Sequence, residues 1–284
     1  MTDFSPKNIK TLWKISDGGH AVVTLVETVD SPKQRFAAKT MSFERGLKKV
    51  RNEYEIHEEL FQKGHKNIIG MYARRSNLFT HTLYLEYAEG GDLFRRLEAP
   101  LMSRKDAKRF FRHLISGMKF IHQNGIVHRD IKPENLLLKN GLLKITDFGS
   151  ALRYINEKGE EIWIDSPGGT RQYRAPEMIA CEKYRGPPVD IWSCGVTFMV
   201  MLTGMQSWDE AGESSNSYGR WVSDEEYEKN PWNTVEVEGM ALLRQMLTDD
   251  PESRAKAEEI ETNPWILEES DKENKTDEVE DDNA

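Results

Sequence analysis

The sequence predicts an α+β fold with a small, β-rich N-terminal lobe and a larger, mostly helical C-terminal lobe. Two patterns support this prediction. Before the Gly90-Gly91 pair, apolar and β-branched residues form short extended runs, whereas after it apolar residues recur at helical spacing. The chain has 284 residues, which is enough for two ordinary domains or one two-lobed unit. Its 38% of hydrophobic residues excludes a wholly disordered protein.

The N-terminal lobe is expected to contain a hairpin, a helix and a further strand. Residues 21–29 and 34–40 have strand composition and are separated by the turn-forming segment Asp-Ser-Pro-Lys, so they predict a β-hairpin. Residues 50–61 are rich in helix formers and are followed by Gly64, a typical helix stop. Residues 83–87 have the composition of a strand that runs into the glycine pair.

Two helices are predicted at the centre of the C-terminal lobe. Ser103 with Asp106 three positions later resembles a capping box, and a strong helical pattern of apolar residues follows it as far as Gly125. The apolar members of this pattern are Ala107, Phe110, Phe111, Leu114, Ile115, Met118 and Ile121. Residues 190–202 are apolar nearly all round, so this second helix should be buried.

Negative charge is concentrated at the C-terminal end. The formal net charge is −9, of which residues 268–284 carry −7 through nine acidic residues and two lysines. This segment has almost no apolar residues, so we expect it to be a disordered acidic tail. Because an acidic chain is poorly suited to neutralising phosphates, direct binding of nucleic acid is not expected.

Cysteine usage and hydropathy favour an intracellular protein. Cys181 and Cys194 are the two cysteines, and without a CxxC motif they disfavour a disulfide framework or a zinc site. The first residues do not resemble a secretory signal, and the most apolar run, 194–202, is about half the length of a membrane span. We therefore expect a nuclear or cytoplasmic protein that does not contact a membrane.

Two short apolar runs flank a loop that is dense in polar residues. Residues 126–138 read IVHRDIKPENLLL and residues 143–149 read LKITDFG. Phosphoryl transfer to a hydroxyl needs oxygen ligands for Mg²⁺, a carboxylate that orients the hydroxyl and accepts its proton, and cations that face the phosphates. The cluster supplies all three through Asp130, Lys132, Asn135 and Asp147.

The order and spacing of these motifs resemble the eukaryotic protein kinase family over residues 9–267. The matching motifs are His128-Arg129-Asp130, Asp147-Phe148-Gly149, Ala175-Pro176-Glu177 and the segment that begins at Asp190. The resemblance implies the bilobal protein kinase fold, with an N-lobe to about residue 85, a hinge at 86–92 and a C-lobe at 93–267. It also implies ATP and Mg²⁺ as cofactors and Ser or Thr acceptors on protein substrates. The APE segment, a platform for protein substrates, disfavours a small-molecule phosphotransferase.

The resemblance assigns roles to single residues of the catalytic loop. Asp130 would be the catalytic base, and Lys132 would neutralise the γ-phosphate. Asn135 and Asp147 would hold Mg²⁺. Farther along the chain, Arg254 would pair with Glu177 and brace the substrate-binding segment.

In the N-lobe the resemblance makes Lys39 the residue that grips the α- and β-phosphates. Because side chains alternate along a strand, Ala37 and Lys39 would share one face. Glu53 would pair with Lys39, with Glu55 as the alternative. The residues implied to bind the nucleotide are Ile15, Ser16, Gly18, Val23, Ala37, Lys39, Glu86, Ala88 and Leu137, with Glu86 and Ala88 acting through their backbone.

The phosphate-covering loop departs from the family's GxGxxGxV pattern. Residues 16–23 read SDGGHAVV, which keeps Gly18 and Val23. Ser16 and Ala21 add side chains where the backbone must approach the phosphates, and both tolerate positive φ less well than glycine. We expect weaker or slower nucleotide handling. A pseudokinase that binds partners, with weak or no phosphotransfer, is the alternative.

Several stretches narrow the resemblance to the checkpoint kinase 1 family of Ser/Thr kinases. They include LEYAEGGDLFRRLE at 85–98, PVDIWSCGV at 188–196 and SWDEAGES at 207–214. This family implies a role in DNA-damage or cell-cycle checkpoint signalling and substrates with Arg three residues before the acceptor. Asp92 and Glu134 match the positions that read this arginine, and Thr170 is also expected to contact the substrate. We expect a monomer.

The segment before the APE motif differs from that family. Residues 170–174 read TRQYR, and their two arginines resemble proline-directed kinases at the site that reads the residue after the acceptor. The sequence therefore leaves the preference at that position open. Arg129 is expected to face the activation segment, where Glu157, Glu160, Glu161 and Asp165 could supply negative charge. Activity is therefore predicted without phosphorylation of this segment.

Overall fold

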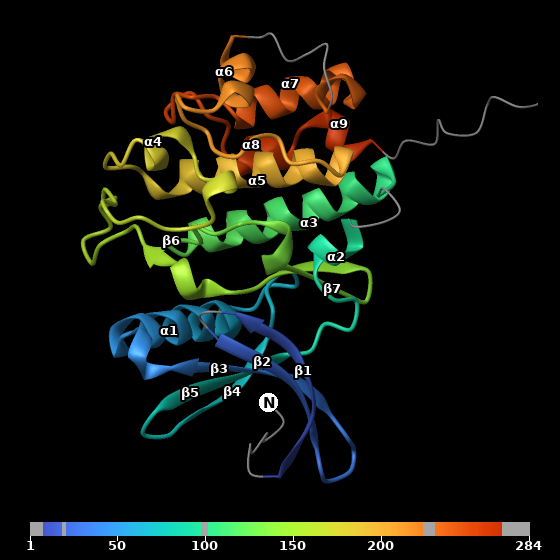
Figure 1. The fold of residues 1–284 in the computed structure, drawn as a ribbon, viewed down its shortest axis with the longest axis vertical. Helices are drawn as coiled ribbons and strands as arrows, with labels where there is room; N and C mark the ends of the chain where they lie inside the picture. The colour runs from blue at the N-terminus through green and yellow to red at the C-terminus, as the bar shows by residue number, and fades with distance from the viewer. Residues whose placement is uncertain (1–7, 19–20, 98–101, 224–230, 269–284) are drawn as a thin grey trace, which may run out of the picture.

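A computed structural model describes residues 8–18, 21–97, 102–223 and 231–268. Figure 1 shows a smaller lobe of strands with helix α1 (Leu47–Lys63) and a larger lobe made mostly of helices. The predicted two-lobed α+β architecture is confirmed. Apart from Glu268, the predicted acidic tail lies outside the described residues. Within those ranges, no helix has both the length and the apolar character that crossing a bilayer requires.

The small lobe is built on a five-stranded antiparallel sheet in the order β1-β2-β3-β5-β4. Its strands are β1 (Ile9–Gly18), β2 (Ala21–Thr28), β3 (Arg35–Ser42), β4 (Met71–Ser76) and β5 (Thr80–Glu86). The predicted hairpin is formed by β2 and β3, and the predicted strand at 83–87 is β5. A 3₁₀ turn, η1 (Phe43–Arg45), leads into α1.

Strands β1 and β4 were not predicted, and both lie at edges of the sheet. The register of β1 against β2 shifts between Thr11 and Trp13 and again between Lys14 and Ser16. These irregularities put the half-buried residues of β1 three positions apart instead of two, which hides the strand pattern. Strand β4 is mostly polar and exposed beyond Met71, as edge strands often are.

The large lobe combines helices with short paired strands. The helices are α2 (Leu93–Leu97), α3 (Arg104–Gln123), α4 (Pro176–Ile179), α5 (Gly186–Thr203), α6 (Asn216–Val222), α7 (Val237–Met246), α8 (Ala257–Glu261) and α9 (Pro264–Leu267). Strand β6 (Ile126–Val127) pairs with β9 (Leu152–Arg153), and β7 (Leu136–Lys139) pairs with β8 (Leu142–Ile145). The remaining 3₁₀ turns are η2 (Pro133–Asn135), η3 (Phe148–Ser150), η4 (Arg171–Tyr173) and η5 (Trp232–Thr234).

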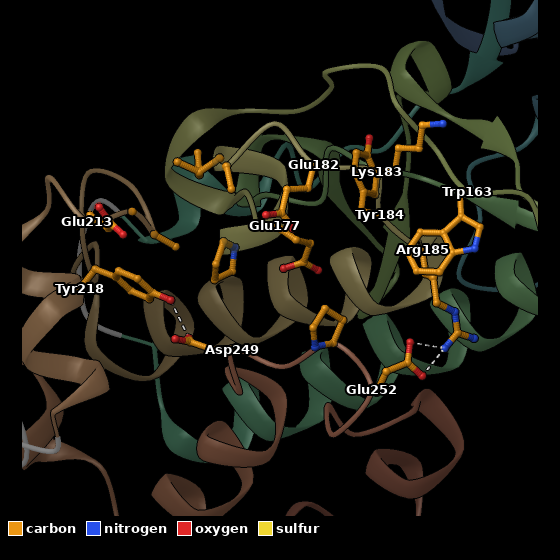
Figure 2. Close-up of a pocket in the computed structure, with 16 residues that line it drawn as sticks. Trp163, Glu177, Glu182, Lys183, Tyr184, Arg185, Glu213, Tyr218, Asp249 and Glu252 are labelled. Carbon is orange, nitrogen blue, oxygen red and sulfur yellow. Dashed lines mark hydrogen bonds and ion pairs between the residues drawn. The ribbon is translucent and has the colours of Figure 1, made fainter.

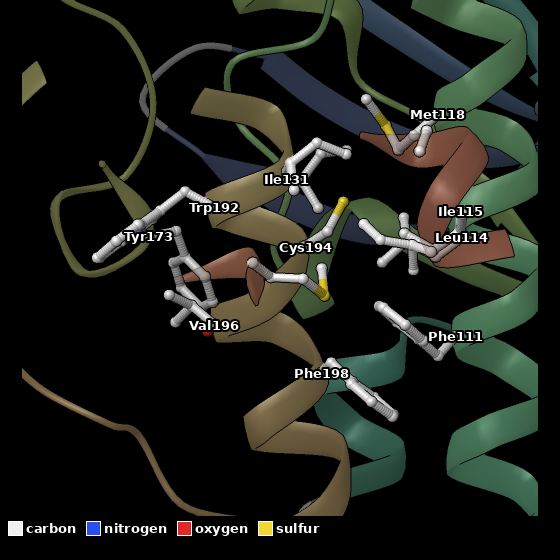
Figure 3. Close-up of a cluster of buried hydrophobic side chains, with 14 of the residues drawn as sticks. Phe111, Leu114, Ile115, Met118, Ile131, Tyr173, Trp192, Cys194, Val196 and Phe198 are labelled. Atoms are coloured by element: carbon white, nitrogen blue, oxygen red, sulfur yellow. The ribbon is translucent and has the colours of Figure 1, made fainter. Parts of the chain in front are cut away.

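Helices α3 and α5 lie side by side at the centre of the large lobe (Figure 1). The Ser103 hydroxyl caps α3 by accepting a hydrogen bond from the Asp106 N–H at 3.1 Å, as predicted. Helix α5 begins before its apolar run, because prolines are tolerated in a first helical turn. Figure 3 shows the core between the two helices, where the rings of Phe111 and Phe198 stack with centroids 3.8 Å apart.

The hinge is fastened to the large lobe by backbone hydrogen bonds. The Gly90 N–H donates to the Leu138 carbonyl at 2.9 Å, and the Leu138 N–H donates to the Gly91 carbonyl at 2.9 Å. A Cβ at Gly90 would lie 2.6 Å from the Leu138 carbonyl oxygen, and Gly91 has a φ of 71°. Both glycines are therefore required for this close approach of the hinge to β7.

Two helical glycines give a matched test of the packing. A Cβ at Gly239 in α7 would lie 2.6 Å from the Trp265 ring, whereas at Gly219 in α6 it would have no atom of the described residues within 4 Å. Gly219→Ala should raise the free energy of unfolding by about 0.5–1 kcal/mol through helix propensity. Gly239→Ala should lower it by about 1–3 kcal/mol because the ring must shift. Urea unfolding of both variants checks this, and equal stabilities would contradict the described packing.

Candidate active site

A buried carboxylate from α5 fixes the start of the loop 128–135. The side chain of Asp190 is fully buried. It accepts hydrogen bonds from the backbone N–H of His128 at 2.8 Å, the backbone N–H of Arg129 at 2.7 Å and His122 Nε2 at 2.9 Å. Burial opposes ionisation, but these donors, led by His122, hold the pKa of Asp190 below its ordinary value. They also fix Arg129, whose φ is 66°.

Asp130 is the centre of a network that joins this loop to Thr170. Its Oδ1 accepts hydrogen bonds from the backbone N–H of Thr170 at 2.9 Å and from its hydroxyl at 2.8 Å. Lys132 Nζ lies 3.2 Å from Asp130 Oδ2 and donates to Thr170 Oγ1 at 2.6 Å. Asn135 Nδ2 donates to the Asp130 carbonyl at 2.8 Å and to Oδ2 at 3.1 Å. Three other predicted site residues, Thr170, Lys132 and Asn135, therefore contact the Asp130 carboxylate.

A second network joins the two lobes through Lys39 on β3. Its buried Nζ lies 2.5 Å from Glu53 Oε1 on α1 and 2.8 Å from Asp147 Oδ1 in the large lobe. Glu55, the alternative partner, instead forms an ion pair with Arg51. Burial favours the neutral amine, but the charges of Asp147 and Glu53 raise the pKa of Lys39 above its ordinary value. Lys39 is therefore a cation held between two carboxylates.

Asp147 and Asn135 have the oxygen chemistry expected of a magnesium site. Asp147 has a φ of 65°, and its Oδ1 also accepts a hydrogen bond from the Gly149 N–H at 3.1 Å. Burial would raise the pKa of Asp147, but Lys39 and Gly149 hold it well below its usual range. The Thr146 N–H donates to the Asn135 carbonyl at 3.0 Å, which ties the two networks together.

The described residues contain no group of three or more His, Cys, Asp or Glu side chains arranged for a metal ion. This result is compatible with Mg²⁺, which commonly takes one or two side-chain ligands and completes its shell with phosphate and water oxygens. The carboxylate of Asp147 and the amide oxygen of Asn135 therefore form a suitable donor set.

His57 is a site residue that the sequence did not reveal. It lies one helical turn after Glu53 on α1, and its ring centroid is 4.8 Å from that of Phe148, which also contacts His128 at 5.2 Å. His57 Nε2 is hydrogen-bonded to the Ile69 carbonyl at 2.8 Å. Burial, with help from the charge of Lys39, lowers the pKa of His57 to about 4. The sequence signal that could have identified His57 is its position four residues after Glu53, which places both on the same face of a helix.

The residues predicted to bind the nucleotide lie on neighbouring strands and along the hinge. Ser16, Val23 and Lys39 are successive cross-strand partners on β1, β2 and β3. The apolar cluster around Leu85 contains or contacts Ala21, Ala37, Ala88 and Leu137. Ile15 is half-buried on β1, and Gly18 ends that strand. Ala21, which replaces a family glycine, therefore packs against this cluster.

Glu86 anchors the hinge through its side chain as well. Its carboxylate lies 3.0 Å from Lys144 Nζ and 3.3 Å from Lys139 Nζ, and it accepts a hydrogen bond from the Gly70 N–H at 3.0 Å. Burial would raise the pKa of Glu86, but the Gly70 N–H and Lys144 lower it below its ordinary value. The sequence predicted a backbone role alone, because lysines on β7 and β8 could not be placed beside the hinge without the fold.

The two acids predicted to read a substrate arginine differ in their surroundings. Asp92 accepts a hydrogen bond from the Arg95 N–H at 2.9 Å, so it also supports the start of α2. Its side chain remains 24% exposed. Glu134 is exposed in the middle of η2, next to the network around Asp130.

The Arg129 side chain donates hydrogen bonds to neutral oxygens of Tyr184 and of the activation segment, which lies between the motifs at 147–149 and 175–177. Nε donates to the Ser150 carbonyl at 2.8 Å. Nη1 donates to the Ser166 carbonyl at 3.0 Å, to its hydroxyl at 3.1 Å and to the Tyr184 hydroxyl at 2.9 Å. Among the acids predicted to supply charge, Glu161 pairs with Arg185 instead.

The predicted ion pair between Glu177 and Arg254 is confirmed. Arg254 donates two hydrogen bonds to Glu177, at 2.8 and 3.1 Å, and is itself buried. Figure 2 shows Glu177 at the wall of a cavity of about 780 Å³, together with residues such as Tyr218 and Asp249. None of the residues that contact Asp130 lines this cavity, so it is separate from the network described above.

Comparison with known proteins agrees with this geometry. The family described as protein kinase domain matches residues 9–266. Serine/threonine-protein kinase chk-1 of Caenorhabditis elegans is 40% identical over 271 residues, covering 92% of this chain and 54% of the relative. Serine/threonine-protein kinase grp of Drosophila melanogaster is 36% identical, covering 76% of this chain and 42% of the relative. Chk1 of Schizosaccharomyces pombe is 36% identical, with 77% and 44% covered. The chain thus spans about half the length of these relatives.

The low pKa of His57 predicts a pH-dependent stability. In the folded protein His57 stays neutral down to about pH 4, whereas in the unfolded chain it takes up a proton below about pH 6.5. Stability should therefore be lost as the pH falls from 6.5 toward 4, by about 1 kcal/mol between pH 7.5 and 5.5. Urea unfolding at both pH values should show a smaller loss for His57→Gln, which can still donate to Ile69. Equal losses would contradict a buried neutral imidazole.

Proposed function

Because the chain belongs to the protein kinase family, we propose that it is a serine/threonine protein kinase of the checkpoint kinase 1 type. The observation that carries the proposal is the contact of Lys39 with both Glu53 and Asp147, tied through Asn135 to the network of Asp130. Relatives from three organisms are named as Ser/Thr protein kinases, which supports the acceptor type.

Asp130 is proposed to orient the acceptor hydroxyl and take its proton. Its Oδ1 already accepts a hydrogen bond from one hydroxyl, that of Thr170, which supports this role. Lys132 donates a hydrogen bond to the same hydroxyl and is proposed to neutralise the charge of the transferred phosphoryl group. For phosphoryl transfer, the substrate hydroxyl must take the place of the Thr170 hydroxyl at Asp130 Oδ1.

A protein kinase domain uses ATP, typically with Mg²⁺. We assign Lys39 to the α- and β-phosphates and Asp147 and Asn135 to the metal. The bound metal would neutralise phosphate charge. Glu53 would hold Lys39 in place, and the cluster around Leu85 would receive the adenine. The contacts of Lys39 with Glu53 and Asp147 favour nucleotide binding and transfer over the pseudokinase alternative.

The substrates are proposed to be proteins with Arg three residues before the acceptor. The exposed carboxylate of Glu134 and the partly exposed carboxylate of Asp92 support this, since a guanidinium bonds well to such groups. Participation in checkpoint signalling is a further part of this proposal and is supported by the names of the relatives. A nuclear or cytoplasmic location is proposed from the cysteine usage and hydropathy of the sequence alone.

Phosphate transfer from labelled ATP to an Arg-x-x-Ser peptide tests the proposed activity. Asp130→Asn should reduce kcat/KM at least about 100-fold, because the amide cannot accept the proton. Asp209→Asn removes the same charge at an exposed position and should have no effect. A peptide with Ala in place of Arg should be a poorer substrate.

A thermal-shift measurement with Mg-ATP separates a kinase that has lost catalysis from a scaffold that does not bind nucleotide. Both the unmodified protein and Asp130→Asn should be stabilised, because Asp130 is not assigned to nucleotide binding. Transfer that survives in Asp130→Asn would contradict the mechanism, and the absence of any shift would favour a scaffold without nucleotide.

Activity should not depend on phosphorylation of the activation segment. The Arg129 guanidinium already has hydrogen-bond acceptors in Ser150, Ser166 and Tyr184, so a phosphate is not needed to order it. The protein treated with a phosphatase, and checked by mass spectrometry, should keep its kcat/KM within about threefold of the untreated protein. An inactive dephosphorylated protein would show that a phosphate is required.

A further inference from the structure

The segment just before η4 passes directly beside the proposed catalytic carboxylate. Thr170 bonds to Asp130 through both its N–H and its hydroxyl. The resemblance of residues 170–174 to proline-directed kinases implies that this segment reads the residue after the acceptor, so a substrate whose hydroxyl reaches Asp130 would place that residue beside Thr170 and the residue before it. Gly169 is the residue before Thr170.

The conformation of Gly169 is fixed by its surroundings. Its φ is 73°, and a Cβ there would lie 2.2 Å from the Arg129 carbonyl oxygen. A side chain is excluded by both the backbone conformation and the space. Because Thr170 is tied to Asp130 on one side, the peptide plane between Gly169 and Thr170 has one orientation.

The Arg174 side chain donates two hydrogen bonds to the carbonyl oxygen of this peptide. Its Nε donates to the Gly169 oxygen at 3.1 Å and its Nη2 donates to the same oxygen at 2.8 Å. A carbonyl oxygen has two lone pairs, so these two N–H groups use its capacity. The neighbouring Arg171 does not share this role, because its Nε bonds to Glu210 at 2.5 Å.

We propose that Gly169 and Arg174 select substrates with proline immediately after the phosphorylated Ser or Thr, an inference that rests on the proposed kinase function. An ordinary residue at this position would bring a backbone N–H against a carbonyl that is already occupied. That N–H would lose its bond to water without a replacement. Proline has no N–H, so it loses nothing on docking. Together with the arginine three residues before the acceptor, the preferred sequence is Arg-x-x-Ser/Thr-Pro.

Three peptides with the same Arg-x-x-Ser core test the selection. They carry Pro, Ala or N-methylalanine after the Ser. The kcat/KM should be about tenfold higher or more for Pro than for Ala, because an unpaired buried N–H is costly. N-methylalanine should match Pro, since it lacks the N–H without the ring. Equal or better use of Ala would overturn the proposal, and a Pro advantage not shared by N-methylalanine would overturn the N–H explanation.

Variants of Arg174 and Arg171 show which of the two arginines is responsible for the preference for proline. Arg174→Leu and Arg174→Met should each reduce the Pro/Ala ratio to near one, because neither side chain can donate a hydrogen bond and the Gly169 oxygen becomes free to accept. Arg171→Leu removes the same charge three residues away and should keep the ratio. A Pro/Ala ratio that persists in a folded Arg174 variant would overturn the role of Arg174.

If neither the Ala peptide nor the Pro peptide is phosphorylated while Mg-ATP still binds, the proposed kinase function fails and this inference falls with it. Phosphorylation of the Ala peptide alone leaves the kinase function intact and overturns only the selection.

Discussion

The site depends on the carboxylate of Asp190, which is buried in the middle of the large lobe and still ionised. A buried charge is stable only when it is fully hydrogen-bonded, and Asp190 meets this condition with two backbone N–H groups and His122. Because both N–H groups belong to the loop that carries Asp130, helix α5 fixes the loop directly. Helix α3 supplies His122, so the two central helices and the loop behave as one packed unit.

The second constraint is electrostatic and acts between the lobes. Lys39 comes from the sheet, Glu53 from α1 and Asp147 from the large lobe, and the three charges converge at one ammonium group. Phe148, next to Asp147, packs against His57 on α1 and His128 in the loop. The position of α1 therefore determines whether the groups assigned to phosphate and metal lie together.

Sequence patterns predicted the architecture and much of the site because local order carries these signals. The hairpin, the two central helices and the cap at Ser103 follow from periodicity and composition, and the roles of Asp130 and Asp147 follow from the resemblance of their motifs to the protein kinase family. The edge strands were missed because the bulges in β1 break its alternation and β4 is polar. His57 and the lysines around Glu86 were missed because their importance arises from contacts between distant segments. The occupied carbonyl of Gly169 was likewise invisible, although the arginines of residues 170–174 drew attention to this segment.

The position of Lys39 has a consequence for how loss-of-function variants are interpreted. Its ammonium separates the carboxylates of Glu53 and Asp147, which are both within hydrogen-bonding distance of it. Exchanging the lysine for a neutral residue removes a phosphate ligand and also leaves two anions facing each other without a counterion. Such a protein would lose the contact that joins the two lobes as well as a phosphate ligand, so an inactive control for scaffolding roles is better made at Asp130.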